Sequence, residues 1–112
     1  MNPRRERSVA EHSAPVFQAL ADPTRLRLVS SLSERGPQSI TGLTRGTRLT
    51  RQAITKHLRV LAGAGLVRGE RLGRESRWEL EPEGLEAARQ YLEMVSERWD
   101  EALGRLRTLV EE

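Results

Sequence analysis

Residues 50–59 read TRQAITKHLR and carry the clearest local signal in the chain. Apolar residues recur here, and just beyond, at intervals of four and three: Ile54, Leu58 and Leu61. This spacing is typical of a helix that buries one face. Thr50 is a good N-cap, because its hydroxyl oxygen can accept a hydrogen bond from a free backbone N–H of the first turn. We therefore predict a helix from Thr50 to about Ala62, ended by the glycines that follow.

Two shorter helices are predicted immediately upstream. Asp22 can cap a helix that starts at Pro23, since proline lacks the N–H that would go unused there. Leu26, Val29 and Leu32 recur at three-residue spacing in that helix, and Leu28 widens this apolar stripe, which is expected to face the core. Gly36-Pro37 stops it, and Ser39 can cap a third, short helix that runs through Leu43.

The N-terminal segment is less regular. Residues 1–12 are polar, rich in arginine and without periodicity, so we expect a flexible arm. A short helix is predicted from Pro15 to Ala21. Residues 13–112 are then expected to form one domain.

After residue 65 the period changes from helical to two. Leu66-Val67 opens a strand, and residues 76–80 alternate with Trp78 and Leu80 on one side. Gly73 marks the tip of a hairpin between the two strands. A helix, a turn, a second helix and a basic hairpin follow one another in a winged helix-turn-helix.

The longest helix is predicted at about 82–110. Its apolar residues step by three and four, as in a coiled-coil seam: Leu85, Ala88, Leu92, Val95, Trp99, Ala102, Leu106 and Leu109. A helix of about 28 residues spans roughly 40 Å, more than the preceding core can cover. Two interpretations remain: the seam joins two copies of the chain, or the helix folds back onto its own domain. The predicted fold class is mainly α with a small β-hairpin wing, dimerising through terminal helices.

Composition limits the function classes. The 112 residues, 37% of them hydrophobic, fit one small domain. Without cysteine the chain has no disulfide, thiolate metal site or cysteine nucleophile, and its two histidines argue against an imidazole metal site. No run of 18 apolar residues and no secretory h-region is present. We expect a cytoplasmic protein without membrane, metal or cofactor.

Charge is distributed unevenly along the chain. Residues 45–77 hold nine basic and two acidic side chains, a net charge of +7, whereas residues 78–112 carry −6. A basic middle third indicates a polyanionic partner, although a solvated basic surface gives the same count.

The helix at 50–62 offers side chains that can recognise DNA. Opposite its apolar face lie Arg51, Gln52, Thr55 and Arg59. Arginine pairs with guanine, glutamine with adenine, and threonine with several base edges in the major groove. Thr50 and the free N–H groups suit a phosphate at the helix N-terminus. The alternative is an ordinary amphipathic surface helix.

Other basic side chains complete the candidate interface. Lys56 and Arg59 flank the exposed face and suit phosphates, whereas His57 could bond a phosphate or brace the wing. The hairpin arginines at 68, 71, 74 and 77 could follow the backbone or enter a narrow minor groove, unless the hairpin is merely solvated. The candidate DNA-binding residues are Thr50, Arg51, Gln52, Thr55, Lys56, His57, Arg59, Arg71, Arg74 and Arg77. No acid lies near Thr55 and His57 to complete a nucleophile–base pair, so no enzyme is predicted.

The assembled pattern resembles the ArsR family of bacterial winged-helix regulators. The matching stretches are ALADPTRL at 19–26, LTRQAITKHLRVL at 49–61, AGLV at 64–67 and GRESRWEL at 73–80. The resemblance implies a homodimer, built from the first and last helices, that represses transcription by binding double-stranded DNA at an inverted repeat. The interface residues it implies are Val16, Phe17, Leu20, Leu92, Val95, Trp99, Leu103 and Leu106.

The chain departs from the metal-sensing members of that family. Residues 39–46 have no Cys-x-Cys motif, and the last helix has a single aspartate, Asp100, and no histidine. The resemblance therefore supports DNA binding and argues against a metal sensor. Another alternative is a winged-helix module that binds proteins and touches DNA without sequence preference. No inducer is indicated by the sequence.

Overall fold

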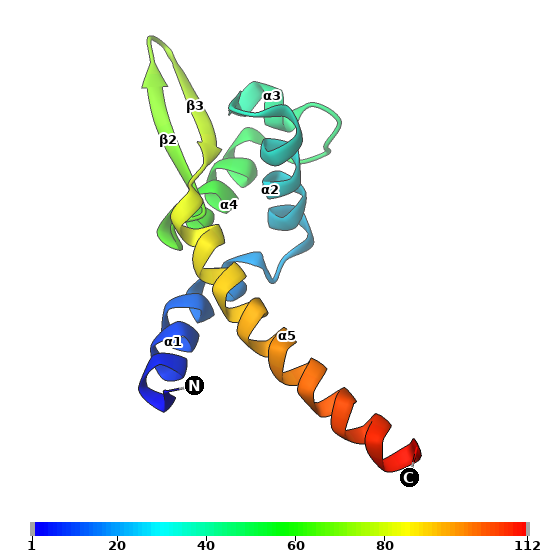
Figure 1. The fold of residues 1–112 in the computed structure, drawn as a ribbon. Coiled ribbons are helices and arrows are strands. Elements are labelled where there is room, and N and C mark those ends of the chain that lie inside the picture. Colours follow the sequence, from blue (N-terminus) through cyan, green and yellow to red (C-terminus); the bar gives the residue numbers. More distant parts are fainter. Residues whose placement is uncertain (1, 112) are drawn as a thin grey trace.

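The computed structural model describes residues 2–111 as a helical domain with one small antiparallel sheet (Figure 1). The elements along the chain are α1 (Pro3–Leu20), α2 (Pro23–Arg35), β1 (Gln38–Ser39), α3 (Ile40–Thr44), α4 (Arg51–Gly63), β2 (Val67–Leu72), β3 (Glu75–Leu80) and α5 (Pro82–Glu111). Helix α3, a turn, helix α4 and the β2–β3 hairpin form the predicted winged helix-turn-helix.

Three predicted N-caps fix where the central helices begin. The side chain of Asp22 accepts a hydrogen bond from the backbone N–H of Arg25 at 3.0 Å. Ser39 and Thr50 accept from the N–H groups three residues on, each at 3.1 Å. These bonds satisfy donors that have no partner inside the helix, and they confirm the predicted starts.

The core is one cluster that every helix and the hairpin share. Its buried members are Val16, Ala19, Leu28, Leu32, Leu43, Ile54, Leu58, Leu61, Leu66, Val67 and Ala88. The predicted apolar face of α4 is confirmed, because Ile54, Leu58 and Leu61 have no exposed surface. This burial fixes the rotation of α4 and so decides which of its side chains face solvent.

The wing is a hairpin whose turn lies at Gly73-Arg74. Gly73 has a φ of 64°, a conformation that L side chains rarely adopt and glycine tolerates. Strand β3 pairs with β2 and also with the two-residue β1, giving the order β1-β3-β2. Trp78 packs against the core as predicted, and its ring lies directly over Gly69. Strand β1 was not predicted, because two residues show no periodicity.

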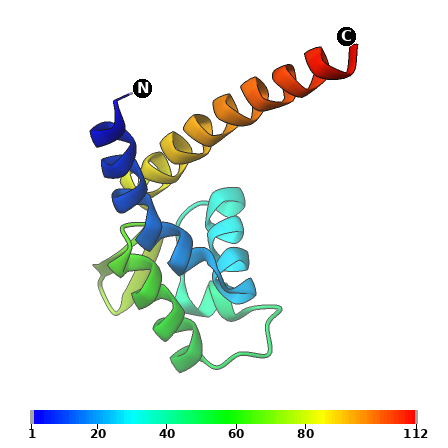
Figure 2. The same cartoon turned by 90° about the horizontal axis from the view of Figure 1, so that it is seen from below.

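Helix α5 is continuous and extends well beyond the core (Figures 1 and 2). Its start is held where the N–H of Gly84 donates to the carbonyl of Gly65 at 3.1 Å. Helix α1 packs beside its first half, whereas the second half projects freely. The chain therefore measures 66 × 30 × 20 Å.

The N-terminal segment differs from the prediction. Residues 3–12, expected as a flexible arm, are helical and continuous with the helix expected only from Pro15. Asn2 caps this helix, Pro3 occupies its first turn, and Glu6 pairs with Arg98 of α5. The N-cap and the ion pair to α5 thus stabilise the first turns of α1, which have no regular apolar spacing. Met1 of the expected arm, and Glu112 of the expected domain, lie outside the described residues.

One predicted core residue is also wrong. Leu26 is 50% exposed, while Leu28 and Leu32 are buried. Leu28 and Leu32 lie four residues apart and therefore on the same face of α2, which packs against the core. Leu26 lies two residues before Leu28, so its side chain points to another side of the helix.

Candidate nucleic-acid interface

Helix α4 presents a polar face at its N-terminal half. Arg51, Gln52, Lys56 and Arg59 are exposed there. Thr55 is half-buried, and its hydroxyl donates to the carbonyl of Arg51 at 2.8 Å. The first two turns of α4 therefore offer one guanidinium and one amide that can reach base edges, as a recognition helix does.

Arg51 is already oriented without DNA. Its Nη1 donates to Oγ1 of Thr41 in α3, at 2.8 Å. This contact links the two helices of the helix-turn-helix and limits the conformations of a long side chain. An arginine that is partly ordered beforehand loses less conformational entropy when it binds.

His57 contacts the segment where α2 begins. Its Nδ1 lies 3.3 Å from Nη1 of Arg25 and 4.0 Å from Oδ2 of Asp22, at the junction of α1 and α2. Arginine can only donate, so in this contact the guanidinium of Arg25 donates to Nδ1. These contacts connect α4 to the start of α2. No hydrogen bond or ion pair among residues 2–111 joins His57 to the wing that it was expected to brace.

The neighbouring charges reinforce this junction. The N–H of Arg25 lowers the pKa of the Asp22 carboxyl, and the guanidinium of Arg25 acts in the same direction. Nε of Arg25 also donates to the carbonyl of Ala19. Arg25 therefore contacts α1, α2 and α4, a role that sequence reasoning missed because the three groups meet only in the folded chain.

The wing arginines differ in their surroundings. Arg68 forms ion pairs with Glu79 at 2.6 Å and Glu81 at 3.5 Å, and the hydrogen bond to Glu79 raises the pKa of Arg68. Arg74 occupies the turn at the tip. The wing thus exposes a cation at its tip, while the cation at its base is already neutralised.

The strand register separates the remaining two wing arginines. Arg71 pairs with Ser76 on the face that carries Trp78, whereas Arg77 pairs with Glu70 on the opposite face. Figure 1 shows the hairpin extending away from α1 and from the free end of α5. Arg71 and Arg77 therefore lie on opposite faces of the wing.

Two further arginines were missed by the residue-level prediction. Arg45 and Arg48 lie exposed in the turn between α3 and α4, just before the capping Thr50. Both were counted in the net charge of residues 45–77. Their spacing follows no helical or strand period, so the sequence did not indicate which surface they occupy.

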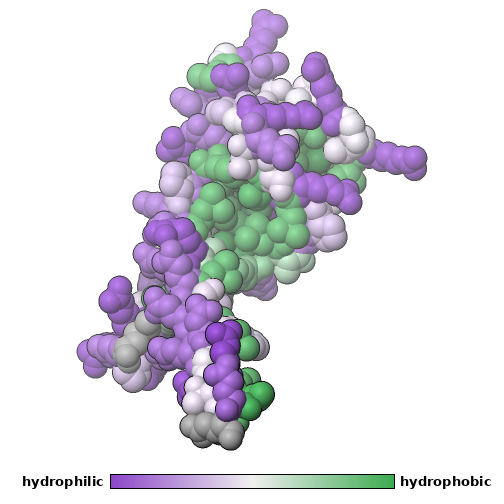
Figure 3. Space-filling view, turned by 45° about the vertical axis from the view of Figure 1, so that its right-hand side comes forward, coloured by the Kyte–Doolittle hydropathy of each residue, from purple (hydrophilic) through white to green (hydrophobic). Residues whose placement is uncertain are grey.

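A second surface consists of apolar side chains on α1 and α5. Phe17 and Leu20 face Leu85, Ala88 and Leu92 across an open cavity of about 610 Å³. Phe17 also packs edge-on against Tyr91, with ring centroids 5.5 Å apart. Figure 3 shows apolar side chains gathered in the middle of one face of the molecule.

This surface continues along the free half of α5. The residues there are half or more exposed: Leu92, Trp99, Leu103, Leu106, Leu109 and Val110. Val95 is half-buried, and Val16 is only 2% exposed within the core of its own chain. Val16, expected at the interface, therefore offers a partner almost no surface.

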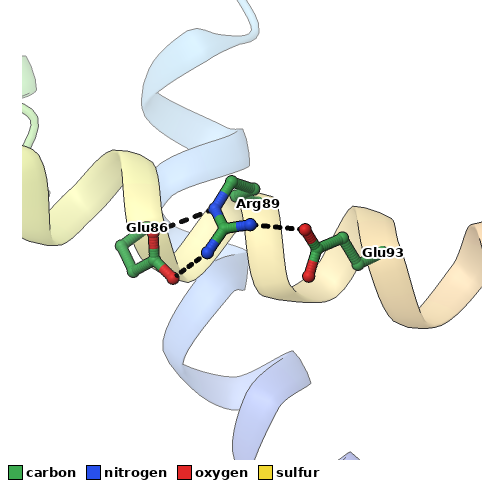
Figure 4. Close-up of polar contacts among 3 residues, drawn as sticks. All are labelled: Glu86, Arg89 and Glu93. Carbon is green, nitrogen blue, oxygen red and sulfur yellow. Dashed lines mark hydrogen bonds and ion pairs between the residues drawn. The ribbon is translucent and has the colours of Figure 1, made fainter.

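A charged strip flanks the apolar surface. Arg89 lies between Glu86 and Glu93 along α5, at 2.6 and 2.5 Å, and α1 crosses behind it (Figure 4). The hydrogen bond from Arg89 lowers the pKa of Glu86. These pairs join residues three and four apart, so they stabilise the helix as well as keeping this flank polar.

Two further structural findings bear on function. Within residues 2–111 no group of three or more His, Cys, Asp or Glu side chains is placed to hold a metal ion. None of the helices described is long and apolar enough to cross a membrane.

Several known proteins are similar to this chain in sequence and in fold. A family model described as a helix-turn-helix domain matches residues 20–70. The HTH-type transcriptional regulator Rv2034 of Mycobacterium tuberculosis is 38% identical over 87 residues, which cover 78% of each chain. A transcriptional repressor SmtB homolog of Synechocystis is 38% identical over 65 residues, covering 58% of this chain and 48% of that one.

A solved structure extends the match to most of the fold. The ArsR-like transcriptional regulator from Rhodococcus sp. RHA1 superposes with a TM-score of 0.74 at 32% identity, covering 91% of this chain and 95% of that one. The winged helix-turn-helix fold of this chain agrees with these matches. The chain belongs to the ArsR family of winged helix-turn-helix transcriptional regulators.

Proposed function

We propose that the protein is a homodimeric repressor that binds an inverted repeat in double-stranded DNA. The observation that carries the proposal is the polar face of α4: its first two turns expose Arg51 and Gln52, while its opposite face is fully buried. Such a helix enters the major groove with its N-terminal residues against the bases. A repressor among the relatives supports the direction of regulation.

The dimer is proposed from the apolar face of α1 and α5. Leu92, Trp99, Leu103 and Leu106 are at least 50% exposed in the single chain, an arrangement that water disfavours. A second copy related by a two-fold axis covers the same residues on both chains. The axis then presents two α4 helices to successive major grooves, about one helical turn apart, and an inverted repeat has the matching symmetry.

The other candidate residues receive phosphate-binding roles in this proposal. Lys56 and Arg59 flank the recognition face, the free N–H groups next to Thr50 face outward at the start of α4, and Arg71, Arg74 and Arg77 lie on the wing. Thr55 adds a methyl group for contact with thymine. His57 is proposed to position α4 through its contacts with Arg25 and Asp22 and not to contact DNA.

Replacing Arg51 or Gln52 by alanine is expected to relax base preference at one position in each half-site. Each loss should cost about 1–3 kcal/mol of discrimination, because a bidentate base contact disappears. The measurement is competitive binding to operator duplexes with single base changes.

Thr41→Val is the matched control for Arg51. It removes the hydroxyl that holds the guanidinium in the free protein but leaves the guanidinium itself. We expect base preference to stay as in the parent. If R51A and Q52A both ranked all duplexes as the parent does, base reading by these two residues would be excluded.

Arg74→Ala is expected to weaken binding to every duplex by a similar factor. The tip arginine contacts phosphates in this account, so the slope of log affinity against log salt should become shallower by about one per chain. Arg68→Ala is the control, because Glu79 and Glu81 already neutralise that guanidinium, and its salt slope should change much less. A changed sequence preference in R74A would contradict a backbone role.

A further inference from the structure

A pocket lined by arginines lies between α2 and the turn that leads into α4. It measures about 480 Å³, within the range of small-molecule sites in proteins. Arg27 and Arg35 reach it from α2, and Arg45 and Arg48 reach it from the α3–α4 turn. We refer to these four residues and the space between them as the arginine pocket.

The floor of the arginine pocket is apolar. Leu28 of α2, Leu43 of α3 and Ile54 of α4 line it, and each is at most 4% exposed. A ligand there would contact all three helices that position the recognition face. The combination of an apolar floor and a cationic rim fits a molecule that is apolar at one end and anionic at the other.

The four arginines of the pocket have no charged partner among residues 2–111. No carboxylate lines the arginine pocket, and none of its four arginines forms an ion pair or side-chain hydrogen bond within residues 2–111. The arginines at 68, 89 and 98, in contrast, are all paired with glutamates. Guanidinium groups bind carboxylates with two parallel hydrogen bonds, which favours an organic acid as the ligand.

We propose that the arginine pocket binds a small organic carboxylate with an apolar body, and that this ligand lowers the affinity for DNA. The regulatory half of the proposal rests on the proposed function. Arg45 and Arg48 lie beside the N-terminus of the recognition helix, so a bound anion neutralises two cations next to the DNA phosphates.

The binding test uses the full chain without DNA. Butanoate, octanoate and benzoate are titrated by calorimetry, with octanol as the uncharged probe and inorganic phosphate as the purely anionic one. We expect octanoate or benzoate to bind, and both octanol and phosphate to bind at least about tenfold more weakly, since each lacks one half of the recognition. In R27A/R35A the carboxylate should also bind at least about tenfold more weakly.

R4A/R5A is the control variant. These two exposed arginines lie at the start of α1, at the opposite end of the domain from α3 (Figure 1), and their loss should leave carboxylate binding unchanged. In the DNA arm, the bound carboxylate should lower the operator affinity of the parent. Without carboxylate, R27A/R35A is expected to bind the operator as the parent does, because it keeps Arg45 and Arg48 in the turn. Adding the carboxylate should leave the operator affinity of R27A/R35A unchanged.

The outcomes separate the two proposals. If no carboxylate binds, if R27A/R35A binds it as the parent does, or if bound carboxylate leaves the operator affinity of the parent unchanged, the inference is overturned while the repressor assignment stands. If phosphate binds as well as the carboxylates, the pocket is a phosphate-contact surface and the inference is again overturned. If the carboxylate binds but the free protein shows no sequence-specific DNA binding, the pocket assignment is supported and the proposed function fails.

Discussion

Replacing both Trp99 and Leu106 by glutamate is expected to convert the proposed dimer into monomers and to lower operator affinity by about 100-fold or more. Trp99 is 63% and Leu106 is 57% exposed in the single chain, so the exchange leaves the core of the domain intact. Burying a large apolar side chain contributes about 1.5–3 kcal/mol, and a two-fold interface uses each residue twice. The two substitutions on each of two chains remove four such contributions, and they bring negatively charged glutamates together in the proposed interface.

The loss of DNA affinity follows from the loss of linkage between half-sites. A dimer binds its second half-site at a high effective concentration, whereas a monomer binds each half-site independently. Sedimentation gives the oligomeric state, and gel shifts on one and two half-sites give the two affinities. We expect W99E/L106E to bind a single half-site about as the parent does and to gain nothing from the second.

Val60→Glu is the matched control for the dimer test. Val60 is an apolar residue of α4 that is 46% exposed but lies outside α1 and α5. This variant should remain dimeric. A dimeric W99E/L106E protein would show that the free half of α5 is not the interface.

Gly84→Ala is expected to destabilise the protein by about 2–3 kcal/mol, although alanine favours helices. A Cβ at this position would lie 2.4 Å from the carbonyl oxygen and 2.7 Å from the carbonyl carbon of Gly65. Both atoms belong to the backbone at the end of α4, so they cannot rotate away as a flexible side chain can. Helix α5 must move off the core, and the cost exceeds the gain of about 1 kcal/mol in helix propensity.

Gly104→Ala makes the same change in the same helix without the clash. Nothing lies within 4 Å of its added Cβ. We expect this variant to be more stable than the parent by about 0.5–1 kcal/mol. Urea denaturation measures the stability of both variants. It is done at one fixed protein concentration, since the proposed dimerisation would contribute to stability. Equal effects at the two positions would rule out the close approach of α5 to the end of α4.

The central fold was predictable because its signals are local. Thr50, Ser39 and Asp22 each cap a helix within their own turn, and the spacing of Ile54, Leu58 and Leu61 selects one face. Glycine at position 73 likewise determines the hairpin turn from its own backbone. Each of these features depends on residues a few positions apart, which a single sequence displays.

The N-terminal half of α1 was missed for the opposite reason. Its polar residues show no helical period, and Glu6 finds its partner Arg98 only after α5 has packed nearby. Leu26 was placed in the core because four apolar residues of α2 fit more than one helical face. Tertiary packing, which chose Leu28 and Leu32, is not visible in the spacing alone.

The sequence predicted which side chains of α4 are exposed, but it did not predict the contacts that they form. The exposed positions of α4 follow from its buried face, so Arg51, Gln52, Lys56 and Arg59 lie where expected. The contact of Arg51 with Thr41, and of His57 with Arg25, joins residues 10 and 32 positions apart. No local pattern reports such contacts, nor the assembly of the arginine pocket from two distant segments.

Sequence-specific binding to an inverted repeat is tested by selection from a pool of random DNA duplexes at near-physiological salt. The retained duplexes are sequenced, and we expect an enriched inverted repeat whose half-sites lie about one helical turn apart. The spacing would report the separation of the two α4 helices in the dimer. Retention without any enriched motif, with binding that disappears as salt rises, would exclude the proposed repressor function and favour a protein-interaction module with only non-specific DNA contacts.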